Sequence, residues 1–401
     1  MAKGHIITGL DLGTGAIKIL VASKKAGEEN LEVLSQNQEI SSGIRRGVVI
    51  DVDGASEVIN SLISRVKSDC GQKITSVYVN IDGGHIFSLP SRGLISVSRA
   101  DQKISEEDIQ RVLQAAQTVS LPSNKEIFDV FPKEFIVDGE KGIKEPLGLQ
   151  GVRLEAEVLA LGGFSPYLKN LTQTVLGVDL QILDIVCSPL AAARAVLNNK
   201  QKELGVALLD IGAGTSGLCV FEENDLIHLA IIPVGSTNIT NDIAIGLKTD
   251  IDIAERIKIE FGTCFPQKVK KREKIEIGEE TPLIFSQKQL SGIVQARVSE
   301  IFDQVNKELK KISREKFLPA GIVLTGGGAK LPRIAELAKK ELKLPCKIGK
   351  PQGFPGLTDP ALSTVCGLVL SGTDLEEKER TFEFGEGVGS KIKRIFKIFL
   401  P

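Results

Sequence analysis

The stretch Gly205-Val-Ala-Leu-Leu-Asp-Ile-Gly-Ala-Gly-Thr-Ser216 decides the fold. Its apolar run at residues 206–209 is too short for a helix and is typical of a buried central strand. An acid, Asp210, stands where this strand ends. The turn that follows contains Gly212, Gly214 and Thr215, and residues 218–221 are apolar again. The pattern therefore predicts a β-hairpin closed by a glycine-rich turn.

This kind of turn is suited to binding phosphate. Glycine lets backbone N–H groups approach a phosphate because there is no Cβ in the way. The carboxylate of Asp210 can hold Mg²⁺ through water, since Mg²⁺ prefers oxygen ligands and keeps much of its hydration shell. The chain continues into a strand after the turn, so we expect a hairpin around a phosphate rather than a strand-to-helix phosphate loop.

The same pattern occurs a second time near the N-terminus. The stretch 6–22 is an apolar strand, an acid at Asp11, a glycine turn and a second strand. Its turn and return strand contain Gly13, Thr14, Gly15 and Lys18. The two copies lie about half a chain apart, which indicates two similar lobes that face one ligand. A single copy could be an ordinary glycine turn, but two copies with matching acids argue against that interpretation.

The composition describes an ordinary globular protein. The chain has 401 residues, 42% of them hydrophobic, and a formal net charge of −1. The charge balance gives no reason to expect a nucleic-acid partner. The six cysteines include no CxxC pair, and we interpret them as reduced thiols of a cytosolic protein. No apolar run reaches the roughly 20 residues that span a bilayer.

A third glycine turn follows the strand at 321–325. Its three glycines, Gly326, Gly327 and Gly328, would let the backbone pass close to a flat group such as an adenine and its ribose. Unlike the first two turns, this one is expected to run into a helix. Glu255 and Lys258 lie three residues apart on another predicted helix and share one of its faces.

The C-terminal segment 390–401 has an amphipathic helical pattern. Ile392, Ile395, Phe396 and Phe399 fall on one face, with Lys393, Arg394 and Lys397 opposite and Lys391 at the edge. Such a helix is too short to span a membrane but can lie in the interface of an anionic leaflet. A terminal helix docked on the body or on another protein is the alternative.

The order of the three turns resembles the actin/DnaK/sugar-kinase superfamily. Within it, the chain resembles the FtsA family of bacterial cell-division proteins along nearly its full length. The motifs that carry this resemblance are 142–153 (GIKEPLGLQGVR), 320–328 (AGIVLTGGG), Gly356-Leu-Thr-Asp359 and the basic C-terminal helix. The three turns alone would indicate only the superfamily.

The resemblance implies a function at the division septum. It implies an α/β, actin-like (ribonuclease H-like) two-lobed ATPase fold with an inserted small α+β subdomain. The family binds ATP and Mg²⁺ and polymerises into filaments on the cytoplasmic side of the cell membrane. There it anchors FtsZ through the FtsZ C-terminal tail and recruits other divisome proteins.

The expected organisation has eight segments. The first lobe comprises 1–82 and 164–203, and an inserted subdomain for self-assembly and partner contacts occupies 83–163. The second lobe comprises 204–242, an outer subdomain at 243–325 for nucleotide and FtsZ contacts, and 326–370. A flexible linker at 371–389 leads to the membrane-targeting helix at 390–401.

The resemblance also implies roles for individual residues. The terminal phosphates would be held by Gly13, Thr14, Gly15 and Lys18 from one lobe and by Gly212, Gly214 and Thr215 from the other, and Gly235 would also bind the nucleotide. Asp11 and Asp210 would hold Mg²⁺ through water. Glu255 and Lys258 would flank the ribose and adenine, with Gly326, Gly327 and Gly328 beneath. Without a nucleotide, Glu255 and Lys258 would be a surface ion pair of little energetic value, and Lys18 a solvated strand residue.

Three positions depart from the family pattern. The second turn has Ala213 between its glycines, and Gly217 stands where many relatives have an acid. The residue that positions the attacking water in active ATPases of the superfamily would fall near Ser188, and serine is a poor substitute for Gln or Glu there. We therefore expect ATP binding with slow hydrolysis or none, and name no catalytic residue.

Three other functions remain as alternatives. A PilM-like adaptor of pilus assembly would have a related architecture but would lack the basic C-terminal helix. A sugar or acetate kinase would need a catalytic carboxylate facing a substrate in the first lobe, for which the sequence offers no candidate with supporting context. A chaperone ATPase would need an appended peptide-binding domain, and no length remains for one.

Overall fold

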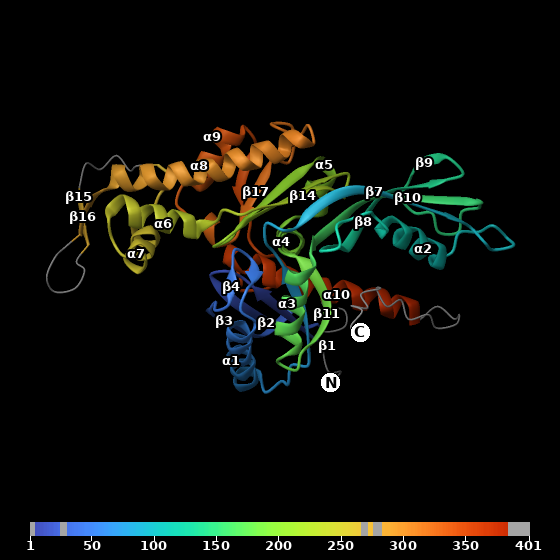
Figure 1. Ribbon diagram of the computed structural model, residues 1–401, viewed down its shortest axis with the longest axis horizontal. Helices are drawn as coiled ribbons and strands as arrows, with labels where there is room; N and C mark the ends of the chain where they lie inside the picture. Colours follow the sequence, from blue (N-terminus) through green and yellow to red (C-terminus); the bar gives the residue numbers. More distant parts are fainter. Residues whose placement is uncertain (1–4, 25–29, 266–271, 276–282, 384–401) are drawn as a thin grey trace.

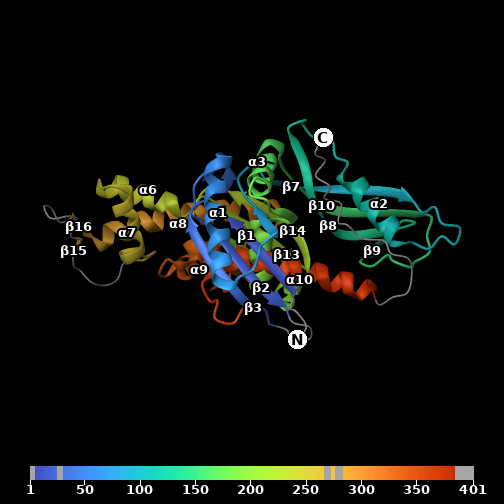
Figure 2. The same ribbon diagram turned by 90° about the horizontal axis from the view of Figure 1, so that it is seen from below.

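The computed structural model describes residues 5–24, 30–265, 272–275 and 283–383. The described chain forms two five-stranded sheets, a separate four-stranded sheet and two short hairpins. Figure 1 shows the four-stranded sheet at one end of the molecule and helices α6, α7 and α8 at the other, and the turned view in Figure 2 shows the same separation.

The first five-stranded sheet has the strand order β11-β6-β1-β2-β3. Its strands are β1 (His5–Leu12), β2 (Ala16–Lys24), β3 (Glu32–Ile40), β6 (Ser76–Ile81) and β11 (Gln181–Cys187). The β1–β2 and β2–β3 pairs are antiparallel, whereas β1–β6 and β6–β11 are parallel. The first predicted hairpin is therefore β1–β2, with Asp11 near the carboxyl end of β1.

The second five-stranded sheet repeats this arrangement. Its order is β18-β17-β12-β13-β14, formed by β12 (Val206–Ile211), β13 (Ser216–Glu222), β14 (Asp225–Ile232), β17 (Ile322–Thr325) and β18 (Cys346–Ile348). Here too an antiparallel hairpin, β12–β13, is followed by parallel strands. The matching topology confirms the internal repeat, and Asp210 occupies the position in β12 that Asp11 occupies in β1.

The segment between β6 and β11 carries a sheet of its own. It is antiparallel, in the order β7-β10-β8-β9, and consists of β7 (Phe87–Ser96), β8 (Lys125–Val137), β9 (Glu140–Ile143) and β10 (Arg153–Phe164). Helix α2 (Glu106–Gln117) packs on it, and Val112 and Ala116 are buried in the core that they share with β10. A capping box between Ser105 and Asp108 begins this helix.

The remaining elements cover the sheets. The helices are α1 (Val52–Cys70), α3 (Ser165–Leu176), α4 (Ser188–Val196), α5 (Asn199–Leu204), α6 (Ser236–Leu247), α7 (Ile251–Phe261), α8 (Gln287–Lys311), α9 (Ile334–Leu342) and α10 (Ser363–Glu383). Two 3-10 turns, η1 (Gly327–Lys330) and η2 (Pro360–Leu362), and two hairpins, β4 (Ile44–Arg45) with β5 (Val48–Val49) and β15 (Arg272–Ile275) with β16 (Leu283–Ser286), complete the list.

Two helices join the lobes. Helix α4 follows the last strand of the first sheet and packs on β12 and β13 of the second, whereas α10 follows the second sheet and packs on β1 of the first. The two helices touch each other closely, because a Cβ at Gly367 in α10 would lie 1.7 Å from the Ala191 carbonyl oxygen in α4. In the lobes that these helices join, the turn after β1 lies against the turn after β12.

The expected segment boundaries need three corrections. The boundary at 242/243 falls inside α6, which begins at Ser236, where the Asn238 side chain accepts a 3.0 Å hydrogen bond from the N-cap N–H of Gly235. The outer segment 243–325 also includes β17, which belongs to the second sheet. Residues 371–383 of the expected linker continue α10, and Ser371 and Thr373 are buried against the first lobe.

The expected membrane helix at 390–401 lies outside the described residues, as does 384–389. In the part of the chain that the structure describes, no helix combines the length and apolarity needed to cross a bilayer.

Candidate functional site

The turns of the two long hairpins face each other. A Cβ at Gly15 would lie 2.9 Å from the Ala213 Cβ, and a Cβ at Gly214 would lie 2.8 Å from the Thr14 Oγ1. The first turn is held in place because the Thr14 hydroxyl accepts a 2.8 Å hydrogen bond from the Gly47 N–H. Side chains at the two glycines would force the turns apart, so glycine is required for this approach.

Asp11 is the centre of the first half of the site. Its carboxylate accepts a 2.8 Å hydrogen bond from the Lys18 ammonium and a 2.9 Å bond from the Asn80 amide. Asn80 in turn accepts a 2.6 Å bond from the Leu12 N–H. Burial opposes the charge of Lys18, but Asp11, Asp210 and Asp359 together outweigh that effect and raise the pKa of the ammonium. Lys18 is thus a committed partner of Asp11, not a solvated strand residue.

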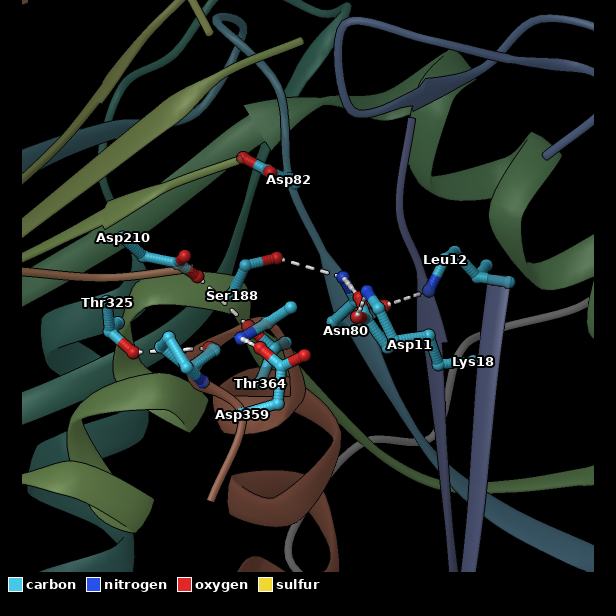
Figure 3. A network of polar contacts seen from close by, with 12 residues as sticks. Asp11, Leu12, Lys18, Asn80, Asp82, Ser188, Asp210, Thr325, Asp359 and Thr364 are labelled. Atoms are coloured by element: carbon cyan, nitrogen blue, oxygen red, sulfur yellow. Dashed lines mark hydrogen bonds and ion pairs between the residues drawn. The ribbon is translucent and has the colours of Figure 1, made fainter. Parts of the chain in front are cut away.

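Asp210 is the centre of the second half. It accepts a 3.0 Å hydrogen bond from the Thr364 hydroxyl of α10. Burial, together with the charges of Asp11 and Asp82, raises the pKa of Asp210 to about 7, although the Thr364 hydrogen bond and the charge of Lys18 oppose this shift. Asp11 and Asp210 are therefore close enough to influence each other, and Figure 3 shows them on either side of Asn80 and Ser188.

The residues present fit a magnesium-bound phosphate group. Burial raises the pKa of Asp210 and the charge of Asp11 adds to that effect, and a cation between the two carboxylates would offset both. Among the described residues, no three carboxylate, thiol or imidazole groups gather as direct ligands. Two carboxylates can hold a hydrated Mg²⁺ through water, because Mg²⁺ keeps much of its hydration shell.

A third carboxylate in the site, Asp82, escaped the sequence analysis. It directly follows β6, and its Oδ2 accepts a 2.8 Å hydrogen bond from the Thr215 hydroxyl of the second turn. Burial raises the pKa of Asp82 to about 6, with Asp11 as a further contribution. The available signal was its position: like Asp11 and Asp210, it is an acid at the carboxyl end of a strand.

Gly235 supports the second turn. It is the N-cap of α6, and a Cβ there would lie 2.4 Å from the Ala213 carbonyl oxygen. The next two N–H groups, of Ser236 and Thr237, donate 2.9 Å hydrogen bonds to the carbonyls of Gly212 and Ala213. The start of α6 thereby fixes the second turn through its carbonyl groups.

Glu255 and Lys258 form a 2.7 Å ion pair on α7, as their spacing predicts. Lys258 is only 8% exposed, and its ammonium also donates 2.9 Å to the Thr240 hydroxyl and 3.3 Å to the Ser236 carbonyl. The pair is therefore more than a solvated surface contact, because it ties α7 to the first turn of α6.

The third glycine turn lies beside Asp210. Gly326 has a φ of +84°, and a Cβ there would lie 2.2 Å from the Asp210 Oδ1. At Gly328 a Cβ would collide with Ile211, whereas a Cβ at Gly327 would meet nothing within 4 Å. The structure thus brings this turn to the site, with Gly327 on its open side.

The departures from the family pattern have local explanations. A Cβ at Gly217 would lie 3.0 Å from two carbons of Pro189 in α4, so an acid does not fit there without a shift of that helix. The Ser188 hydroxyl accepts 2.9 Å from the Asn80 amide and donates 3.2 Å to the Ile81 carbonyl. Ser188 is therefore fully engaged in structural hydrogen bonds.

Comparison with known proteins identifies the family. The family model "Cell division protein FtsA" matches residues 207–367, and the model of the SHS2 domain inserted in FtsA matches 83–161. The cell division protein FtsA of Pseudomonas aeruginosa is 36% identical over 377 residues, which cover 92% of this chain and 90% of the relative.

Two solved structures share the fold. The PilM–PilN type IV pilus biogenesis complex aligns with a TM-score of 0.65 at 15% identity and covers 91% of this chain and 98% of the matched one. MreB5 of Spiroplasma citri bound to ADP aligns with a TM-score of 0.56 at 15% identity, over 95% and 99% of the two chains. The chain has the actin-like ATPase fold with an SHS2 insertion, and it belongs to the FtsA family of cell division proteins.

Proposed function

We propose that this protein binds ATP and Mg²⁺ and polymerises on the cytoplasmic side of the cell membrane at the division septum. There it anchors FtsZ and helps to assemble the divisome. The observation that carries the nucleotide part is the close approach of the two glycine turns, one from each lobe, with Asp11 and Asp210 near the strand ends that lead into them.

The proposed nucleotide position follows from the arrangement of these groups. Gly13, Thr14, Gly15 and Lys18 would contact the terminal phosphates from the first lobe, and Gly212, Gly214 and Thr215 from the second. Mg²⁺, held through water by Asp11 and Asp210, would neutralise part of the phosphate charge. Glu255, Lys258 and Gly327 would lie along the ribose and adenine.

Slow hydrolysis or none is part of the proposal. The Ser188 hydroxyl is bound to Asn80 and Ile81, and serine is a weak base in any case. Both oxygens of Asp82 accept hydrogen bonds, from Thr215 and from the Gly83 N–H. Turnover faster than about 1 per second would contradict this part of the proposal.

Protein contacts are proposed for the two ends of the molecule. Ile245 in α6 and Ile259 in α7 are 77% and 71% exposed, in the outer part of the second lobe. Large exposed apolar side chains are typical of surfaces that bind another protein. The FtsZ tail is the proposed partner there, and the 83–163 insertion at the opposite end would contact further copies or other divisome proteins.

The membrane part can be tested by flotation on liposomes. Full-length protein with ATP and Mg²⁺ should float with anionic phosphatidylglycerol vesicles and carry FtsZ with it. Protein truncated to 1–389 should stay behind, and so should a charge-reversed Lys393→Glu/Arg394→Glu variant. Zwitterionic vesicles are the matched control, because they lack the negative surface that attracts the basic face.

The outcomes separate the candidate functions. If full-length protein and truncation behave alike on anionic vesicles, the membrane tether is wrong. In that case a PilM-like adaptor, favoured by the fold similarity to the pilus complex, becomes the better proposal. If vesicles bind the protein but not FtsZ, the tether stands and the anchoring role fails.

A further inference from the structure

Asp82 connects the two lobes at the phosphate end of the site. It stands directly after β6 of the first lobe, whereas Thr215 belongs to the β12–β13 turn of the second. The Thr215 Oγ1 donates 2.8 Å to the Asp82 Oδ2, and the Gly83 N–H donates 2.7 Å to the Oδ1. Each carboxylate oxygen of Asp82 therefore accepts one hydrogen bond.

The hydroxyl that Asp82 holds is one that a phosphate would need. A hydroxyl has a single proton to donate, so Thr215 can serve Asp82 or a phosphate oxygen, but not both. Thr215 is only 4% exposed, which leaves it little freedom to find another acceptor. Binding of a terminal phosphate by this hydroxyl requires Asp82 to give it up.

The charge of Asp82 acts in the same direction. Asp11 and Asp210 already lie within electrostatic reach of Asp82, with Lys18 as the cation paired to Asp11. A triphosphate brings about one more negative charge into this space than a diphosphate does. Charges at such separations in a partly buried site repel each other strongly.

We propose that Asp82 determines specificity at the nucleotide site and disfavours a γ-phosphate relative to a nucleotide that ends at the β-phosphate. It does so by its negative charge and by its hold on the Thr215 hydroxyl. This inference rests on the proposed nucleotide site, and it adds a residue that weakens the binding of ATP more than the binding of ADP.

The test compares two nucleotides in three variants. Asp82→Asn removes the charge at nearly constant shape and leaves one acceptor oxygen for two donors. Asp82→Ser removes the charge with a smaller side chain and serves if the first variant folds poorly. Asp303→Asn, at an exposed position of α8, changes the net charge equally at a distance and is the matched control. Each protein is titrated calorimetrically with ADP and with the non-hydrolysable β,γ-imido analogue of ATP, both with Mg²⁺. The result is the ratio of the affinity for the ATP analogue to the affinity for ADP.

The inference predicts a selective change. Asp82→Asn should raise the affinity for the ATP analogue by about tenfold relative to ADP, and Asp82→Ser should act in the same direction. Asp303→Asn should leave the ratio unchanged. Equal changes for both nucleotides, or a fall in the ratio, would overturn the inference and leave the nucleotide site intact. Wild-type protein that binds neither nucleotide would overturn the site and the inference together.

Discussion

Replacement of Asp210 by asparagine should stabilise the empty protein while it weakens Mg²⁺-nucleotide binding. Asparagine has the shape of the carboxyl group and can still accept the hydrogen bond from Thr364. It lacks the negative charge that burial and the neighbouring Asp11 and Asp82 make unfavourable. Without a cation in the site, the charge of Asp210 is a cost to the folded state.

The size of the effect follows from the pKa of Asp210, about 7 in the folded protein against an ordinary value of 3.8. At 1.36 kcal/mol per pKa unit this difference corresponds to about 4 kcal/mol. Asp210 keeps some exposure to water, so we expect a gain of about 2 kcal/mol. Because the folded pKa is raised, the stability is complete below the unfolded pKa and is lost as the pH rises through the folded pKa.

The assay is denaturant unfolding in EDTA without nucleotide, with the midpoint followed from about pH 8 down to about pH 4. The variant should exceed wild type by about 2 kcal/mol near pH 8, and the difference should shrink as the pH falls towards 4. The control Asp303→Asn should show no such trend. A variant that is less stable near pH 8, or a gain that does not change with pH, would refute the reasoning.

Three further predictions concern residues around the site. Asn80→Ala leaves the buried Leu12 N–H and one oxygen of Asp11 without their hydrogen-bond partner, so the free energy of unfolding should fall by about 2–4 kcal/mol. A fall of less than about 0.5 kcal/mol would contradict this role of Asn80. Burial lowers the pKa of His85, whose Nδ1 accepts from the Phe164 N–H at the far end of the insertion. Because this folded pKa is depressed, the hydrogen-exchange protection factors in 83–164, corrected for the intrinsic pH dependence of amide exchange, should fall as the pH drops below about 6.5, and His85→Ala should abolish that fall; protection factors that do not change with pH in wild type would contradict it. Lys258→Met should weaken nucleotide affinity about tenfold, because Lys258 orients Glu255. The control Arg256→Met breaks only an exposed ion pair with Glu260 and should change the affinity less than twofold. Equal effects of the two substitutions on nucleotide affinity would contradict this prediction.

The parts of the site that could be predicted from sequence are those in which one short segment carries the whole pattern. Asp11 and Asp210 each stand between an apolar strand and a glycine turn, so their position could be assigned from neighbouring residues alone. Lys18 pairs with Asp11 because the two lie opposite each other in the β1–β2 hairpin. The turn length fixes that register.

Asn80 and Asp82 could not be assigned in this way, because their partners are distant in the sequence: Asn80 binds Asp11 at a separation of 69 residues, and Asp82 binds Thr215 at a separation of 133. β6 pairs in parallel with β1, with Leu10 opposite Val79. This register brings Asn80 next to Asp11. Nothing local to β6 specifies which strand it will join, so the partners of these two residues become visible only in the folded chain.

The error at 371–383 had a different cause. The segment is acidic and poor in aliphatic residues, which favoured a linker. Its Leu, Glu, Lys and Arg residues are nevertheless good helix formers. Helix α10 has already begun at Ser363 in close contact with α4, so each added residue only extends an existing helix. Tertiary packing upstream therefore supplied the nucleus that the local composition did not reveal.

The central claim is that one hydrated metal ion and one nucleotide bridge Asp11 and Asp210. Crystals grown with ADP and Mn²⁺ in place of Mg²⁺ would locate the ion directly by anomalous scattering. The account predicts a single manganese peak between the two carboxylates, beside the phosphates and between the 13–15 and 212–215 turns. A peak bound at only one carboxylate and remote from the other, or a nucleotide bound elsewhere with no ion between these residues, would contradict it.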